Sequence, residues 1–198
     1  IEQLWQRDRP RILTPLGNDT ILKRAIADIV VETRDWGEQV TVAPEVRVHF
    51  EPMHHWSARS LWDRNRALWA AFVLDTPDGP VYFVGDSGYG GGDNFRAAAR
   101  KHGPFRLAIL PIGSYDPRWF MQDAHMNPAE AVQAWTELGR PPTLPTHYGM
   151  FQLADTGYDQ PLRDLETALR AAGAAPDSFR PLRAGSFWEV GVMERTED

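Results

Sequence analysis

The sequence predicts an α/β protein in which strands of mixed direction alternate with helices. Residues 46–51 alternate apolar with polar side chains, which is the two-residue period of a half-buried strand. Two apolar runs flank the turn-rich segment 75–80 (DTPDGP), a pattern typical of a hairpin. Helices with recognisable caps separate the other strands, and no linker or repeat divides the chain.

The first half of the chain contains two predicted helices followed by strands. Asn18 is the expected cap of the second helix. In the first strand, His49 is expected on the polar, solvated face, opposite the apolar side chains. The predicted elements are a helix in 1–8, an extended segment in 11–17, a helix in 18–27, a strand in 40–52 and hairpin strands in 68–74 and 81–86.

The second half alternates helix and strand. Asn127, Pro128, Glu130 and Gly139 give the clearest helix signals, with a cap, a first-turn proline, an acidic first turn and a glycine stop. For the preceding helix, Asp93 or Asn94 is the expected cap. The predicted elements are helices in 93–103, 126–139 and 160–173, and strands in 105–113, 142–147 and 179–190.

Composition narrows the class of protein. The 198 residues are enough for one domain that buries about 70% of its unfolded surface. The net charge is −6, and the 21 Lys and Arg residues are scattered, which argues against a nucleic-acid partner. The absence of cysteine excludes thiolate metal sites and fits a cytoplasmic location. No apolar run is long enough for a membrane span, and the chain begins with Ile1 rather than Met.

Candidate chemistry lies where three predicted strands end. One strand leads into His54 and His55, the next ends at Asp86, and a third ends at His147. In α/β proteins such strand ends can converge on one point. Two imidazoles and a carboxylate form a ligand set for zinc or another divalent transition metal, with bonds of about 2.0–2.2 Å.

Structural interpretations compete with this hypothesis. A histidine at a strand end is more often a surface or hydrogen-bonded residue than a metal ligand. Because His54 and His55 are adjacent, they would point to opposite faces of a strand, so at most one is a good candidate. The glycine-rich segment 85–94 lacks the pattern of a phosphate or dinucleotide loop, and its glycines are better suited to a sharp turn beside a metal site.

The segment 111–128 is long and apolar for a loop, so it either packs over the core or lines a pocket. Trp119 and Phe120 are candidate substrate-binding residues, with packing alone as the alternative. Arg118 and His125 could be scaffold residues held by salt bridges or hydrogen bonds. A guanidinium beside a metal pocket would also suit an anionic substrate, which makes Arg118 a third candidate for substrate binding.

Several segments together resemble one family. In chain order these are HHWSARSLWDRN, FVGDSGYG, GPFRLAILPIGSYDPRWFMQDAHMNPAEAV and PTHYGMF. They resemble the bacterial relatives of N-acyl-phosphatidylethanolamine-hydrolysing phospholipase D, which are metallo-β-lactamase-fold hydrolases. The resemblance implies a four-layered αββα sandwich with a two-zinc site at the edge of its sheets.

The resemblance also implies residue roles. His55 corresponds to a histidine ligand of the first zinc, Asp86 to the aspartate that bridges both ions, and His147 to a ligand of the second. His125 matches a histidine near the substrate pocket. Asp86 and His125 are therefore the candidate catalytic residues.

One feature of the family is absent from the sequence. The family's His-x-His-x-Asp-His segment supplies four of its seven zinc ligands and would lie upstream of Ile1. We therefore expect residues 1–198 to be a single domain that forms the C-terminal part of a longer metallo-β-lactamase-fold hydrolase.

The predicted function is that of a zinc-dependent phosphodiesterase, acting through a hydroxide held between two zinc ions. Its expected substrate is a small or lipid-like anionic molecule, with transient membrane contact for a lipid. The alternatives are hydrolysis of another bond, such as a lactone or an amide, and a non-catalytic remnant. An oligomer is left open by the sequence.

Overall fold

The computed structural model describes residues 1–151 and 154–193. Its strands form a six-stranded sheet, in the order β3-β4-β5-β6-β7-β8, and a parallel pair, β1-β2. The strands are β1 (Ile12–Pro15), β2 (Val31–Arg34), β3 (Gln39–Ala43), β4 (Val46–Glu51), β5 (Ala71–Asp75), β6 (Val81–Phe83), β7 (Leu107–Pro111) and β8 (Thr143–Thr146). The α-helices are α1 (Glu2–Asp8), α2 (Asn18–Ala25), α3 (Asp93–His102), α4 (Arg118–Met121), α5 (Pro128–Glu137) and α6 (Gln160–Ala171). Two short 3-10 turns, Gly90–Gly92 and Pro176–Ser178, complete the described elements.

The large sheet is mixed, as predicted. Strands β3 to β6 pair antiparallel, whereas β6, β7 and β8 run parallel. The carboxyl ends of these three strands therefore meet at one edge, where α/β folds collect their ligands. The residues that follow β6 and β8, Asp86 and His147, are brought to the same edge by this topology.

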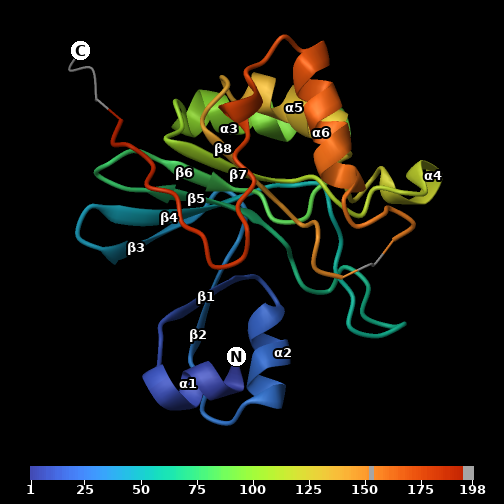
Figure 1. The fold of residues 1–198 in the computed structure, drawn as a ribbon. Helices are drawn as coiled ribbons and strands as arrows, with labels where there is room; N and C mark the ends of the chain where they lie inside the picture. Colours follow the sequence, from blue (N-terminus) through green and yellow to red (C-terminus); the bar gives the residue numbers. More distant parts are fainter. Residues whose placement is uncertain (152–153, 194–198) are drawn as a thin grey trace.

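Helices α3, α5 and α6 cover one face of the large sheet (Figure 1). The main core lies between this sheet and the helices. Tyr82 and Leu110 from the sheet are buried with Phe95 from α3, Trp135 from α5 and Leu165 from α6. Truncating one such side chain to alanine typically costs about 2–5 kcal/mol of unfolding free energy, so this core holds the strand ends in place.

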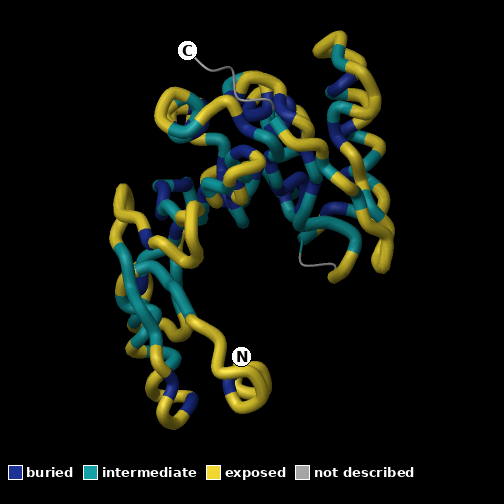
Figure 2. Tube along the Cα trace, turned by 90° about the vertical axis from the view of Figure 1, so that its left-hand side faces the viewer, coloured by how far each residue is buried: buried dark blue, intermediate teal, exposed yellow. Residues whose placement is uncertain are grey.

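The N-terminal elements lie on the other side of the sheet (Figure 1). Leu13 of β1 packs against a buried cluster that includes Val40 and Phe50. Trp5 and Ile26 belong to a separate small core among α1, α2 and β2. The order of layers is thus helix, sheet, sheet and helix. Figure 2 shows that the trace next to the N-terminus is mostly exposed.

Three predicted details of the strands are wrong. Residues 40–52 are not one strand, because the chain reverses between Ala43 and Val46 and forms the β3–β4 hairpin. His49 is not solvated: it is half-buried, and its ring centroid lies 4.6 Å from that of His102. The segment 179–190 forms no strand; Phe179 makes an isolated bridge to β8 instead.

Two predicted helix caps are also wrong. Asn18 does not cap α2; its side-chain amide donates to the Pro15 and Leu68 carbonyls. Glycines with positive φ, Gly17 and Gly92, occupy the N-cap positions of α2 and α3. The cap of α5 is confirmed, because Asn127 and Glu130 form a reciprocal capping box.

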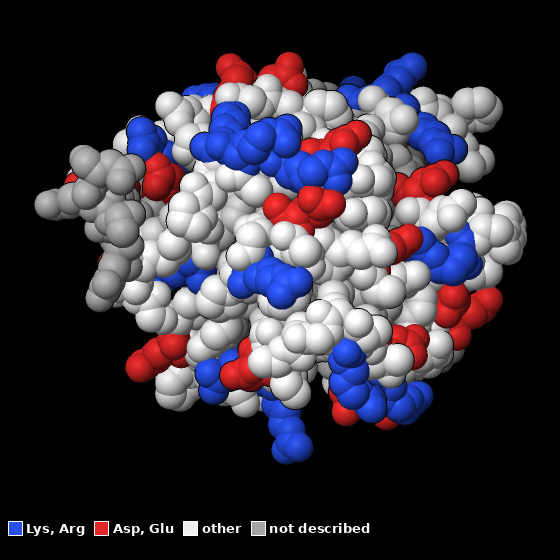
Figure 3. Space-filling model, turned by 90° about the horizontal axis from the view of Figure 1, so that it is seen from above, with Lys and Arg blue, Asp and Glu red and all other residues white. Residues whose placement is uncertain are grey.

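Charged side chains of both signs are interspersed on the face that Figure 3 shows. None of the helices in the described part of the chain is both long and apolar enough to span a membrane.

Candidate metal centre

Three of the predicted site residues lie together at the edge of the large sheet. The ligand atoms that Asp86, His125 and His147 offer all lie within 4.8 Å of one another. His147 Nδ1 is 3.2 Å from Asp86 Oδ1, and the rings of His125 and His147 stack at a centroid distance of 5.3 Å. His55 packs edge-on against His125, with ring centroids 5.4 Å apart. The structure therefore gathers three imidazoles around one carboxylate.

A backbone bridge brings the His54–His55 segment to the Asp86 loop. His54 and Gly88 form an isolated antiparallel bridge, in which Gly88 N donates to His54 O at 2.8 Å. The buried Ser87 hydroxyl accepts from His54 N and donates to Gly88 O. This role of Ser87 was not predicted from the sequence. Its position directly after Asp86 was the signal that could have suggested it.

Buried imidazole nitrogens without partners are the strongest sign of a metal-binding site. Within the described residues, His55 Nδ1, His125 Nδ1 and His147 Nε2 are buried without a hydrogen bond, as is His54 Nε2. An unsatisfied buried polar atom costs about 1–3 kcal/mol, so native proteins seldom leave several together. Imidazole nitrogens and a carboxylate are ligands that suit a divalent transition metal. The residues present therefore fit a metal ion.

Burial keeps two of these rings neutral. It lowers the pKa of His125 to about 4, although the Asp86 carboxylate opposes this shift. Burial also lowers the pKa of His55, against the opposing effects of Asp86 and a hydrogen bond to the Ala124 backbone. Metal coordination requires a neutral imidazole, so both rings are in the form that can donate a lone pair.

Arg118 is held by neighbouring residues. Its guanidinium makes a bidentate salt bridge to Glu130, at 2.7 and 2.9 Å, and donates to the His125 carbonyl at 2.9 Å. Glu130 in turn accepts from Asn127 N in the capping box. This network fixes the backbone of His125 and corresponds to the scaffold alternative, while a substrate contact by Arg118 stays a prediction.

Trp119 and Phe120 do not pack into the core. They lie on α4 and are 80% and 64% exposed, with ring centroids 5.6 Å apart. Packing alone therefore does not explain them. Their role in substrate binding stays a prediction.

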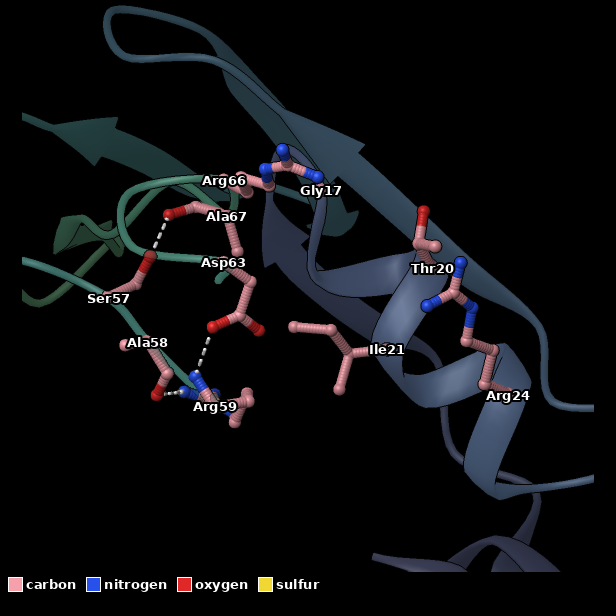
Figure 4. A pocket seen from close by; sticks show the side chains of 10 residues that line it. All are labelled: Gly17, Thr20, Ile21, Arg24, Ser57, Ala58, Arg59, Asp63, Arg66 and Ala67. Carbon is pink, nitrogen blue, oxygen red and sulfur yellow. Dashed lines mark hydrogen bonds between the residues drawn. The ribbon is translucent and has the colours of Figure 1, made fainter. Parts of the chain in front are cut away.

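Two cavities were not anticipated from the sequence. A cavity of about 70 Å³ borders His147 and is lined by Tyr148 and Tyr158 among other residues. A larger one, of about 240 Å³, lies between α2 and the loop 57–67 (Figure 4). Arginines 24, 59 and 66 contribute to its lining, and Asp63 is tied to the backbone amides of its own loop. Arginines scattered over α2 and the loop 57–67 gave no sequence signal for this second cavity.

The layered mixed sheet and the His/Asp cluster at its edge define an α/β protein of the metallo-β-lactamase fold. Residues 6–148 match the family described as "Beta-lactamase superfamily domain", and the chain belongs to this family. The isothiocyanate hydrolase from Delia radicum gut bacteria has a similar structure, with a TM-score of 0.66 at 12% identity, covering 92% of this chain and 67% of that one. The fold predicted from the sequence is confirmed.

Two curated relatives that match most of this chain are longer than it. An uncharacterized protein of Mycobacterium tuberculosis is 35% identical over 196 residues, which cover 92% of this chain and 51% of the relative. The N-acyl-phosphatidylethanolamine-hydrolyzing phospholipase D 1 of Caenorhabditis elegans is 33% identical over 161 residues, covering 79% and 45%, respectively. The chain thus spans about half the length of these relatives.

Proposed function

We propose that the protein containing this chain is a metal-dependent hydrolase with its active site beside the ends of β6 and β8. The observation that carries this proposal is the group of buried, unpartnered imidazole nitrogens around Asp86. His55, Asp86 and His147 would hold the metal. The complete site is proposed to contain two zinc ions. His125 lines the same space and offers a further free nitrogen.

A bound metal supplies a Lewis acid that lowers the pKa of water toward about 7 and polarises a substrate oxygen. The chain's own residues prepare the site. The partly buried rings of His55 and His125 stay neutral because burial lowers the pKa of each. The Asp86 carboxylate orients His147 through its 3.2 Å contact with Nδ1. Arg118 and Glu130 hold the loop that carries His125.

The proposed substrate is a lipid-like phosphodiester. The similarity to the worm phospholipase D, whose name describes hydrolysis of N-acyl-phosphatidylethanolamine, supports this choice. The exposed Trp119 and Phe120 lie in the segment that leads to His125, and aromatic side chains of this kind suit an acyl chain or a membrane interface. Transient membrane contact through these two residues is part of the proposal.

Substrate profiling of the whole protein, loaded with zinc, tests this function. We expect cleavage of an N-acyl-phosphatidylethanolamine and little cleavage of a lactone or an amide. The Asp86→Ala variant should lose more than about 100-fold in kcat/KM, because a ligand should matter at least as much as the groups that support ligands. Asp177→Ala, at an exposed aspartate in the short turn before Phe179, is the matched control and should retain full activity.

Other outcomes separate the alternatives. Cleavage of only the lactone or the amide would contradict the phosphodiesterase and leave a hydrolase of another bond. A whole protein that binds no zinc and cleaves none of the three substrates would support a non-catalytic module and contradict the hydrolase.

A further inference from the structure

A second group of potential metal ligands lies away from the Asp86 cluster and shares no residue with it. His49 and Glu51 are two residues apart on β4, so they extend from the same face of the sheet. Phe50, between them, is fully buried on the opposite face. His102 is the last residue of α3, the helix that covers this face (Figure 1).

The three side chains are close together, and two of them are well buried. His102 Nε2 lies 2.8 Å from Glu51 Oε1, and the His49 and His102 ring centroids are 4.6 Å apart. One ligand atom from each residue lies within 4.8 Å of the other two. The side chains of Glu51 and His102 are only 9% and 7% exposed. The group is therefore built into the junction of a strand and a helix.

Lys101 is the cation that neutralises Glu51 in this structure. Its Nζ lies 2.6 Å from Glu51 Oε1, and its side chain is 47% exposed. An ion pair explains why the buried Glu51 is tolerated. It does not explain His49, whose ring receives no hydrogen bond in the described residues and packs against His102.

We propose that His49, Glu51 and His102 form a second binding site for a divalent transition metal such as Zn²⁺, which replaces the Lys101 ammonium on Glu51. Two imidazoles and one glutamate are a ligand set found in zinc sites that keep an open fourth position. Ligand atoms on a tetrahedral ion with bonds of about 2.0–2.1 Å lie about 3.3 Å apart, so side-chain shifts of about 1–1.5 Å suffice. Lys101 can move into solvent because half of its side chain is already exposed.

An ion at this site would connect β4 to α3. The chain runs on from the end of β4 to His54 and His55, whereas α3 follows the Asp86 loop. Both β4 and α3 are thus adjacent in sequence to segments of the candidate metal centre. The second ion would stabilise the frame of that centre without contacting its substrate.

Metal counting on the whole protein tests this proposal. The His49→Asn/His102→Gln variant keeps polar side chains that can still hydrogen-bond but loses both imidazoles. We expect it to bind one Zn²⁺ fewer than the wild type in calorimetric titration and elemental analysis. With Co²⁺ as the probe, part of the visible d–d absorption should disappear. Hydrolytic activity should persist, which separates failure of this site from failure of the proposed function.

The two lysines of the chain provide a matched pair. Lys101→Met removes the competing cation and should tighten Zn²⁺ binding at the second site by about tenfold, given the strength of a close charge pair. Lys23→Met, at a surface lysine paired with Asp19, should leave the affinity unchanged. An unchanged zinc count in the His49→Asn/His102→Gln variant would overturn the proposal, as would equal affinity in the two lysine variants.

Discussion

At the scale of single residues, the candidate metal centre depends on a close backbone contact. His147 adopts a left-handed conformation, with φ 60°, directly after β8. A Cβ atom on Gly113 would lie 1.9 Å from the His147 carbonyl oxygen, well inside contact distance. Glycine is therefore required at position 113 because a side chain would not fit there, and not because of its backbone dihedral angles. It sets where the His147 ring meets Asp86.

The Gly113→Ala variant should displace His147 and weaken metal binding by about 10–100-fold, as loss of a supporting group does. Overpacking of this kind should also lower the unfolding free energy by about 1–3 kcal/mol. Zinc titration and urea denaturation measure the two effects. Gly191→Ala, whose Cβ would meet nothing within 4 Å, is the control and should change neither. Wild-type zinc affinity in Gly113→Ala would show that this contact does not position His147.

At the scale of elements, side-chain salt bridges and hydrogen bonds connect the loop after β7 to neighbouring helices. Arg118 connects α4 to Glu130 of α5, and the capping box starts α5 next to His125. Tyr115 is buried and its hydroxyl donates to Asp164 of α6 at 2.6 Å. The long segment that carries His125 is thus held at several points, which gives it the rigidity that a binding site needs.

The hydrogen bond between Tyr115 and α6 should be lost at alkaline pH. Burial, helped by Asp164, raises the pKa of Tyr115 above its usual value near 10. The folded state therefore favours the neutral phenol. The contribution of this phenol to the unfolding free energy is complete below pH 10 and is lost as the pH rises through the higher folded-state pKa. Unfolding free energy should fall less steeply above pH 10 in Tyr115→Phe than in the wild type. Identical slopes in the two proteins would contradict this role.

At the scale of the whole molecule, one edge of the sheet gathers residues from position 55 to position 147. Segments this far apart meet because β6, β7 and β8 are parallel and a continuous core fixes them against α3, α5 and α6. The partnerless nitrogens at this edge reduce the stability of the metal-free state. Metal binding should therefore stabilise the entire fold.

Zinc should raise the unfolding free energy of the whole protein by about 2.7 kcal/mol for each site when free zinc is about 100 times the dissociation constant. Thermal denaturation with zinc and after chelation measures this gain. Magnesium is the matched control and should have little effect, because it prefers oxygen ligands to imidazole. The Asp86→Ala variant should lose most of the gain from the candidate metal centre. Equal stabilisation by zinc in the wild type and in this variant would contradict its role as a ligand.

Local patterns in the amino-acid sequence predicted most of the elements and placed Asp86 and His147 at the ends of strands. Side-chain alternation, glycine stops and the Asn127–Glu130 capping box act over a few residues, so they can be detected without knowledge of the fold. The same local signals predicted a strand in 179–190 that does not form. There the Arg106 side chain binds the Val190 and Gly191 carbonyls, and the segment does not extend a sheet.

Which polar side chains meet depends on the tertiary packing. It placed His125 against His147, brought His102 to Glu51 across 51 positions and put the Gly113 backbone against His147. It also exposed Trp119 and Phe120, whose apolar character had allowed either packing or a pocket wall. These outcomes depend on how layers pack and on which strands are neighbours, so local patterns in the sequence do not contain them.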